Sequence, residues 1–270
     1  MAISDSMAVQ TIDERRCDDV LEVRQLSAGY PGKRNAVYDI SFSLREGERV
    51  AVIGPNGAGK TTLFKALVGL IPHNEGHISL HGRDCDSSHT LIGYVPQQEA
   101  VDWNFPATVY DVVMMGRTRK IGWFRWPGTA DRQVVESALA QVGMAHLRDR
   151  QIGALSGGQR RRVFIARALA QETDLLLLDE PFSGVDVAAE EEIVRVLDDL
   201  TASGITMLLA THNLDMAASR FDRLLLLNQT ALALGRPDEV LQPSLLKRAY
   251  GDRVSVIQAQ DTTIVVADYH

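Results

Sequence analysis

A short apolar strand followed by a glycine-rich loop constrains this chain more than any other feature. Residues 50–53 are a continuous apolar run, and residues 63–67 have helical spacing. Between them lie Gly54, Pro55, Asn56, Gly57, Ala58, Gly59, Lys60, Thr61 and Thr62. In such a strand–loop–helix unit the backbone N–H groups converge on an anion, and the helix N-terminus adds partial positive charge. We therefore predict a nucleoside triphosphate site, with Lys60 at the β- and γ-phosphates and Thr61 as a Mg²⁺ ligand. The alternative, a chance glycine-rich turn, leaves the flanking strand and helix unexplained.

Composition narrows the class of protein. The 270 residues are 45% hydrophobic, enough for a sizeable core without disulfides, and the cysteines Cys17 and Cys85 suit a reducing compartment. The net charge of −7 indicates no nucleic-acid partner. Residues 1–19 carry acidic side chains without a continuous apolar stretch, which predicts a loose polar tail and no signal peptide. Apolar runs elsewhere fall short of the roughly 20 residues of a membrane span, so we expect any membrane connection to come through a partner.

Hydrophobic periodicity predicts an α/β fold. Apolar alternation indicates strands at residues 21–26, 37–44, 77–80 and 91–95 and, farther on, at 174–179, 205–210 and 223–227. The first two read as an antiparallel pair joined by a turn at residues 30–33, and a helix at 188–200 separates two later strands. Residues 98–167 read as helical. Strands joined by crossover helices predict a mainly parallel core sheet, with an antiparallel β subdomain before it and a helical subdomain inserted at 98–167.

Two carboxylates end a buried strand. Four leucines at residues 175–178 precede Asp179 and Glu180. Ligands gather at the carboxyl ends of parallel strands, where the phosphate loop also begins. We expect Asp179 to hold Mg²⁺ through water and Glu180 to deprotonate an attacking water. A charged turn entering solvent is the alternative, and the phosphate loop nearby disfavours it.

A second anion-binding surface precedes an amphipathic helix at residues 160–171. It is formed by Leu155, Ser156, Gly157, Gly158 and Gln159. Ser156 is a suitable N-cap, and the glycines leave helix N–H groups open. One interpretation is that this segment is only a capped helix start. The other is that it is a second phosphate-binding surface, which would serve a site on another copy of the chain because this copy already has a phosphate loop.

The phosphate loop, residues 155–159 and residues 175–180 together resemble, in order and spacing, the Walker A, signature and Walker B elements of the ATP-binding cassette (ABC) family. The resemblance covers about residues 20–245 and implies a P-loop NTPase fold with a RecA-like core sheet, followed by a strand-like tail at 246–270. It also implies a homodimer in which the signature of one cassette contacts the ATP held by the other.

Further positions resemble the family's motifs, and their roles follow from that resemblance. Tyr30 would stack on adenine, Gln97 would contact Mg²⁺ and the water, and His212 would sense the γ-phosphate. Asp186 would cross the dimer interface in the D-loop, although Gly184 and Val185 depart from the commoner alanine and leucine there. The resemblance assigns catalysis to Glu180, His212, Lys60 and Gln97, and Mg²⁺ binding to Thr61, Gln97 and Asp179.

The motifs of an ATPase do not identify the process that the ATPase drives or the substrate that is moved. A DNA-repair or chromosome ATPase of this superfamily would split the cassette with a coiled coil, and no heptad run lies between Lys60 and Leu155. A translation factor would carry two cassettes, whereas this chain has one. We therefore expect a peripheral subunit on the cytoplasmic face of the membrane, bound to two permease subunits.

Several short segments resemble the branch that imports manganese, zinc or iron(II) with an extracytoplasmic metal-binding protein. They are residues 101–106, 111–117, 122–124 and 182–186, with 249–251 and the tail at 254–266. An importer of a siderophore, haem or cobalamin is the alternative.

Aromatic and basic side chains gather before the signature, at Trp103, Phe105, Arg117, Arg119, Lys120, Trp123, Phe124, Arg125 and Trp126. We expect them to form either a surface for the permease or part of a small core, with Trp103 and Phe105 lining a docking groove. A metal site at His81, Cys85 and His89 with Asp84 and Asp86, or at Asp268 and His270, matches no closed zinc pattern and reads as solvated loop.

Overall fold

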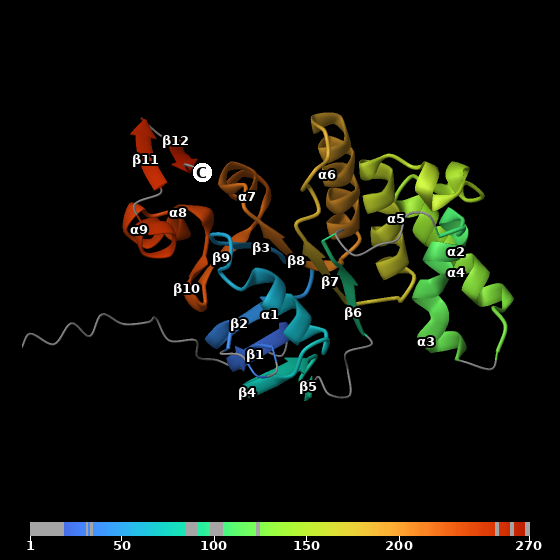
Figure 1. The fold of residues 1–270 in the computed structure, drawn as a ribbon, viewed down its shortest axis with the longest axis horizontal. Helices are drawn as coiled ribbons and strands as arrows, with labels where there is room; N and C mark the ends of the chain where they lie inside the picture. The colour runs from blue at the N-terminus through green and yellow to red at the C-terminus, as the bar shows by residue number, and fades with distance from the viewer. Residues whose placement is uncertain are drawn as a thin grey trace, which may run out of the picture.

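The computed structural model describes residues 19–30, 32, 35–84, 91–97, 105–122, 125–251, 254–259 and 262–267. A six-stranded sheet occupies the middle of the molecule, with a four-stranded antiparallel sheet on one side and a group of helices at one end (Figure 1). The predicted α/β fold, with its parallel core sheet, antiparallel subdomain and inserted helices, is confirmed.

The central sheet brings four loops to one edge. Its strand order is β10-β9-β3-β8-β7-β6, and every neighbouring pair is parallel except β9 with β10. The strands are β3 (Arg49–Ile53), β6 (Ile92–Val95), β7 (Leu175–Asp179), β8 (Thr206–Thr211), β9 (Arg223–Asn228) and β10 (Thr230–Gly235). Because Ile53 pairs with Thr211 and Asp179 with Ala210, these strands end together.

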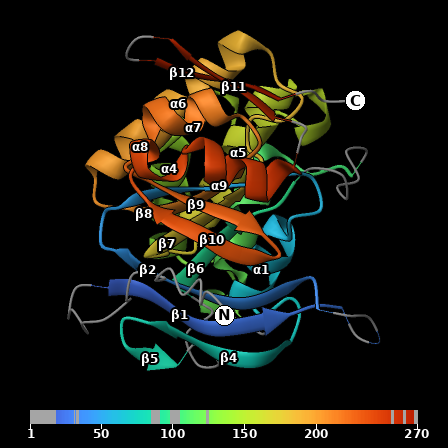
Figure 2. The same ribbon diagram turned by 90° about the vertical axis from the view of Figure 1, so that its left-hand side faces the viewer.

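The antiparallel sheet lies below the central sheet in Figure 2. Its order is β2-β1-β4-β5, from β1 (Asp19–Ala28), β2 (Val37–Arg45), β4 (His73–Leu80) and β5 (Arg83–Asp84). The predicted pairing of residues 21–26 with 37–44 is confirmed, with Val23 opposite Phe42. Part of the predicted turn at residues 30–33 lies outside the described residues.

Alternating side chains of the central strands divide the core into two layers. Val50 and Val52 pack toward the antiparallel sheet and helix α1 (Lys60–Leu67). Ala51 and Ile53 point the opposite way, into the layer formed with the helices. The same alternation occurs in β7, β8 and β9, whose residues are all buried apart from the two ends of β9, because both faces of the sheet are covered.

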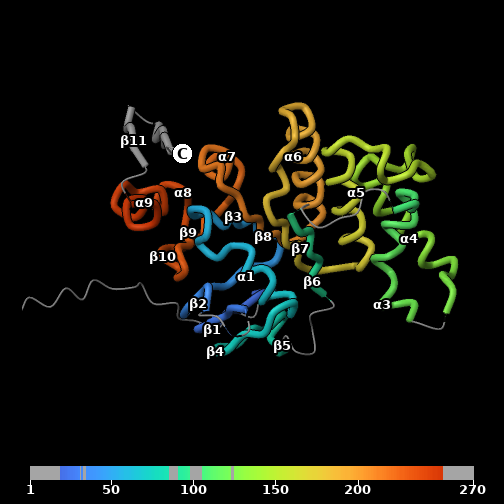
Figure 3. Tube along the Cα trace, in the orientation of Figure 1, coloured from blue at the N-terminus to red at the C-terminus, as the bar shows by residue number. Residues whose placement is uncertain are grey.

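The inserted helices lie beyond β6, at the far end of the molecule from β10 (Figure 3). They are α2 (Val109–Met114), the 3₁₀ turn η4 (Met115–Arg117), α3 (Thr118–Ile121), α4 (Thr129–Gln141), the 3₁₀ turns η5 (Ala145–Leu147) and η6 (Ile152–Ala154), and α5 (Gly157–Leu169). Helix α5 begins three residues before its predicted start, because Ser156 caps it.

The prediction that Arg117 belongs to an exposed binding surface is wrong. Its guanidinium is buried, and its Nε donates to Asp131 at 3.1 Å while Nη1 donates to Glu172 at 2.6 Å. Lys120 also pairs with Glu172. These ion pairs fasten η4, α3 and α4 to the turn between α5 and β7.

The remaining elements complete the helical layer and the C-terminal end. They are α6 (Val187–Ala202), α7 (Leu214–Arg220), α8 (Pro237–Val240), α9 (Pro243–Tyr250), and the hairpin of β11 (Val254–Ala259) and β12 (Thr262–Ala267). Helix α9 crosses the expected cassette boundary at residue 245, because Leu246 and Ala249 are buried in the core. The strand-like tail is therefore the hairpin, which begins at Val254.

Candidate nucleotide site

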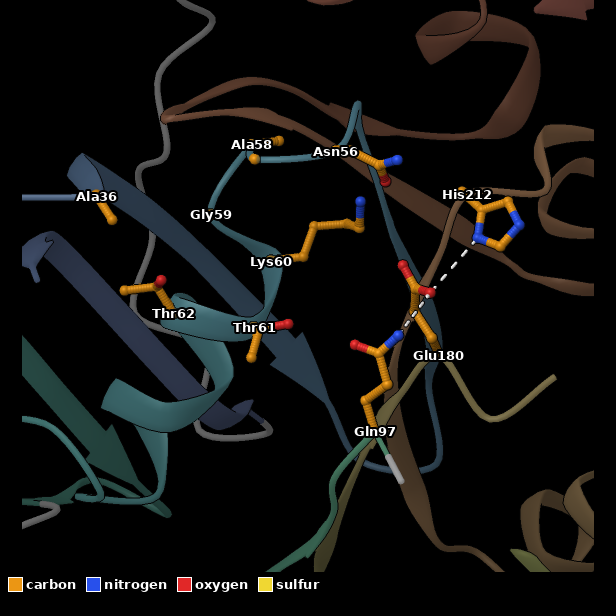
Figure 4. Close-up of a pocket in the computed structure, with 11 residues that line it drawn as sticks. Ala36, Asn56, Ala58, Gly59, Lys60, Thr61, Thr62, Gln97, Glu180 and His212 are labelled. Carbon is orange, nitrogen blue, oxygen red and sulfur yellow. Dashed lines mark hydrogen bonds and ion pairs between the residues drawn. The ribbon is translucent and has the colours of Figure 1, made fainter. Parts of the chain in front are cut away.

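A cavity of about 660 Å³ opens at the carboxyl edge of the central sheet. The phosphate loop after β3 forms one wall, and the opposite wall carries single side chains from the loops after β6, β7 and β8. The residues lining the cavity are Ala36, Asn56, Gly57, Ala58, Gly59, Lys60, Thr61, Thr62, Gln97, Glu180 and His212 (Figure 4). The structure thus brings together residues whose closeness the sequence could only suggest. Ala36 was not predicted.

The phosphate loop is tightly packed from behind. A Cβ on Gly54 would lie 2.1 Å from the carbonyl oxygen of Leu227 in β9, so no larger residue fits there. Gly57, with φ of 81°, has no neighbour within 4 Å of such a Cβ, and it lines the cavity. The loop therefore rests against β9 at its start and leaves open space where an anion would lie.

Lys60 folds back over its own loop. Its Nζ donates to the carbonyl oxygens of Gly54 at 2.8 Å and Pro55 at 3.2 Å. Burial lowers the pKa of Lys60, and the carboxylates of Glu180 and Asp179 oppose that shift. A buried ammonium beside open space is suited to binding an anion such as a triphosphate.

Glu180 lies between two polar neighbours on the wall opposite Lys60. Its Oε2 accepts from Gln97 Nε2 at 3.5 Å and lies 3.6 Å from Nδ1 of His212, and these contacts are the dashed lines of Figure 4. Its backbone has φ of 49°, the left-handed region that is costly for a residue with a Cβ. Strain at a single glutamate in a cavity is typical of functional sites, where the fold maintains a geometry the residue alone would avoid.

Asp179 is buried beneath the cavity with one oxygen unsatisfied. Its Oδ2 accepts from the Tyr94 hydroxyl at 3.3 Å, whereas its Oδ1 has no hydrogen-bond partner among the described residues. Burial raises the pKa of Asp179, and the neighbouring Thr61 hydroxyl opposes that shift. A buried unpaired carboxylate oxygen beside a threonine hydroxyl fits the oxygen ligands that Mg²⁺ prefers. Tyr94 was not predicted, because a tyrosine in a buried strand gives no sign of its partner.

The signature residues lie outside this cavity, as the resemblance implied. Ser156 caps α5 by accepting from the backbone N–H of Gln159, and the Gln159 side chain returns a contact to the Ser156 N–H. Ser156 and Gly157 are exposed, whereas Leu155 is buried. The start of α5 thus offers open N–H groups to the surroundings and not to the molecule's own cavity.

The two signature glycines differ in how closely other residues pack against them. A Cβ on Gly158 would lie 2.5 Å from the Cβ of Ala189 in α6, so Gly158 is needed for contact between two helices. A Cβ on Gly157 would have its nearest neighbour at 3.8 Å. Gly157 therefore has no packing reason to be glycine, which makes it the stronger candidate for contact with a ligand.

Tyr30 and Asp186, two further predicted site residues, do not line the cavity. Tyr30 is 41% exposed and lies beside Lys65, whose Nζ is 5.7 Å from the ring centroid and donates to the Tyr30 hydroxyl at 3.3 Å. This exposure is compatible with the expected base stacking. Asp186 caps α6 by accepting from the N–H of Ala189 at 2.9 Å.

The other predicted sites are only partly described. Trp103, Trp123, Phe124, Cys85, Asp86, His89, Asp268 and His270 lie outside the described residues. His81 contacts Asp174 at 3.2 Å, and no cluster of three metal-binding side chains occurs within the part of the chain that is described. Phe105 and Trp126 are exposed.

Comparison with known proteins decides the family. The ABC transporter family model matches residues 37–183. The zinc transport system ATP-binding protein TroB of Treponema pallidum is 44% identical over 87% of this chain and 88% of its own length. The chain belongs to the ABC transporter family. It is an ABC ATPase, which hydrolyses ATP to drive transport.

Other relatives give the same family. The manganese transport system protein MntB of Bacillus subtilis is 44% identical over 84% of this chain and 90% of its own. YfeB of Yersinia pestis, named for chelated iron transport, is 44% identical over 90% and 83%. A solved metal-chelate type ABC transporter in an inward-facing conformation has a TM-score of 0.78 and 32% identity, covering 93% of this chain and 98% of that one. Among the described helices of this ABC subunit, none is long and apolar enough to cross a membrane.

Proposed function

We propose that this ABC ATPase energises an importer of a transition-metal cation: manganese, zinc or iron(II). The identity of 44% to relatives named for zinc, manganese and chelated iron transport carries the proposal. The cavity does not indicate the cargo, because its lining residues are those expected to bind a nucleotide. The cargo would pass through the permease and would be delivered to it by an extracytoplasmic metal-binding protein.

The working unit proposed is a homodimer bound to two permease subunits at the cytoplasmic face of the membrane. Its support is the division of the site: Lys60 and Glu180 line the cavity, whereas Ser156 and Gly157 are exposed outside it. Two copies placed head to tail would let each signature helix complete the other's site. The exposed Phe105 is a candidate contact for the permease.

In the proposed mechanism the phosphate loop and Lys60 bind the triphosphate, and Tyr30 stacks on the base. Thr61, Asp179 and Gln97 would hold Mg²⁺, which when bound neutralises phosphate charge. Glu180, in reach of Gln97 and His212, accepts the proton of the attacking water, and His212 with Lys60 stabilises the charge that develops. Partner contacts through Gly157 and Asp186 would close the site.

Glu180→Gln tests the catalytic assignment. We expect nucleotide affinity close to that of the native chain and a fall in kcat of about 10²- to 10⁴-fold, because the amide cannot accept the proton. Calorimetric titration with MgATP and a steady-state phosphate assay measure the two quantities. Glu191→Gln, at an exposed position of α6 that lines no cavity with Glu180, is the matched control and should leave both unchanged. Near-normal turnover of Glu180→Gln would reassign the base.

Elemental analysis of cells tests the cargo. A strain with only the Glu180→Gln form is compared with the native strain under metal limitation, with Glu191→Gln as control. A selective fall in manganese, zinc or iron would identify the cargo. Unchanged metal content alongside lost ATPase activity would overturn the metal proposal and leave the ATPase assignment intact. The likeness to a metal-chelate type transporter makes an organic metal chelate the second candidate, tested by uptake of the labelled chelate.

A further inference from the structure

Arg161, on the signature helix α5, is an unusual buried cation. Only 2% of it is exposed, and it heads the fully buried side chains of the described chain by volume. Burial of a guanidinium is costly unless it is paired with a carboxylate or fully hydrogen-bonded. Arg117, the other buried arginine, has two carboxylate partners. Arg161 has none within ion-pair distance among the described residues.

The guanidinium of Arg161 instead joins two loops. Its Nη1 donates to the carbonyl oxygen of Pro96 at 3.4 Å, and its Nη2 donates to that of Ser183 at 3.3 Å. Its Nε has no hydrogen-bond partner in the described chain. Pro96 immediately precedes Gln97, and Ser183 lies midway between Glu180 and Asp186. Arg161 therefore contacts the backbone of the loop that carries Gln97 and the backbone of the loop that follows Glu180. The contact between Gln97 and Glu180 is the one proposed to act in catalysis.

The surroundings of Arg161 favour a role in function over one in stability. Both hydrogen bonds are long and reach neutral carbonyls, so they offset little of the cost of burying the charge. The carboxylates of Asp179 and Glu180 lie within electrostatic range, although burial still lowers the pKa of Arg161. A methionine of similar length would cost less free energy to bury. The presence of a cation at this buried position therefore indicates a role other than stability.

We propose that Arg161 is a positioning residue for ATP hydrolysis, which holds the loops of Gln97 and Glu180 in register with the signature helix. The planar guanidinium carries separate donors on Nη1 and Nη2, so it can reach two carbonyls on opposite sides. A small displacement of either loop would misalign the base with the attacking water.

Arg161→Met removes the charge and both donors. We expect kcat to fall about 10- to 100-fold with KM for ATP nearly unchanged, because the phosphate loop is untouched. The melting temperature should be equal or higher, because an unpaired buried charge has been removed. Hydrogen exchange at the amides of residues 97 and 183–186 should be faster. Arg117→Met is the matched control: its melting temperature should fall, because Asp131 and Glu172 each lose an ion pair, and kcat of the folded fraction should stay at the native value.

Arg161→Lys separates charge from geometry and serves if Arg161→Met does not fold. A lysine keeps the charge, but its flexible ammonium lacks the fixed planar fork of donors that spaces the two carbonyls, so kcat should still fall while KM holds. Native kcat in Arg161→Lys, or in a folded Arg161→Met, would overturn the proposal. A raised KM with unchanged kcat would also overturn it, since it would assign Arg161 to ATP binding.

Discussion

The phosphate loop and the start of α5 both join glycines to a helix N-terminus, but their surroundings differ. Gly54 is pressed against the carbonyl of Leu227, and Lys60 is tied to the loop it follows. At the start of α5, Gly157 is exposed, and a Cβ there would make only ordinary contacts, the nearest at 3.8 Å. The phosphate loop is thus supported by contacts within one chain, whereas the start of α5 is exposed, as the proposed contact with a partner's nucleotide requires.

The largest expected effect tests the support behind the phosphate loop. Gly54→Ala should lower the free energy of unfolding by about 3 kcal/mol or more and weaken ATP binding, because the new methyl group overlaps the backbone of β9. Denaturant unfolding and calorimetric titration measure the two effects. Gly57→Ala, where only backbone strain is added, should cost about 1–2 kcal/mol. Native stability in Gly54→Ala would mean that the loop can move away from β9.

The next largest effect is a difference between substitutions at the two signature glycines. Gly158→Ala should cost about 1–3 kcal/mol of stability, because its methyl group meets Ala189 at 2.5 Å. Gly157→Ala should leave stability within about 0.5 kcal/mol yet reduce ATP hydrolysis, because in the proposed dimer its methyl group would face the partner's nucleotide.

Unfolding curves and phosphate assays on both signature variants give this comparison. The double variant Gly158→Ala with Ala189→Gly should recover the stability lost by the clash. If Gly157→Ala hydrolyses ATP at the native rate, the proposed contact at that residue is wrong.

The smallest effect concerns how the helices that carry the signature are fastened. Hydrogen bonds from Lys120, and then from Arg117, lower the pKa of Glu172. The unfolded chain then binds a proton more readily than the folded one, so the Glu172 contribution is present above pH about 4.3 and is lost as the pH falls further.

Glu172→Gln should therefore cost about 0.5–1 kcal/mol at pH 7, a small value because half of the Glu172 side chain is exposed. Urea unfolding of both proteins from pH 7 to pH 3 measures the difference, which should shrink in the acid range. A difference that stays constant with pH would exclude the ion pairs as its cause. Phosphate-loop variants should show no such dependence in that window.

How far the sequence could predict the site depended on the kind of signal each residue carries. Lys60, Asp179 and Glu180 lie in continuous motifs beside strands, so local pattern was enough to predict their elements and to suggest their closeness. Tyr94 and Ala36 lie in segments whose pattern only indicates burial or a turn. Arg117 read as a surface cation because charge usually indicates exposure, and its partner Glu172 lies far along the chain.

Local order in the chain alone determined the phosphate loop, the capped start of α5, the strands and the layered α/β architecture, because turn chemistry and hydrophobic period act over a few residues. The tertiary structure decided which glycine is pressed by a neighbour, which oxygen of Asp179 stays free, and which arginine is buried against carbonyls. These depend on contacts between residues distant in sequence, such as Arg161 with Pro96 and Gly54 with Leu227. Only the packed sheet edge brings those residues together.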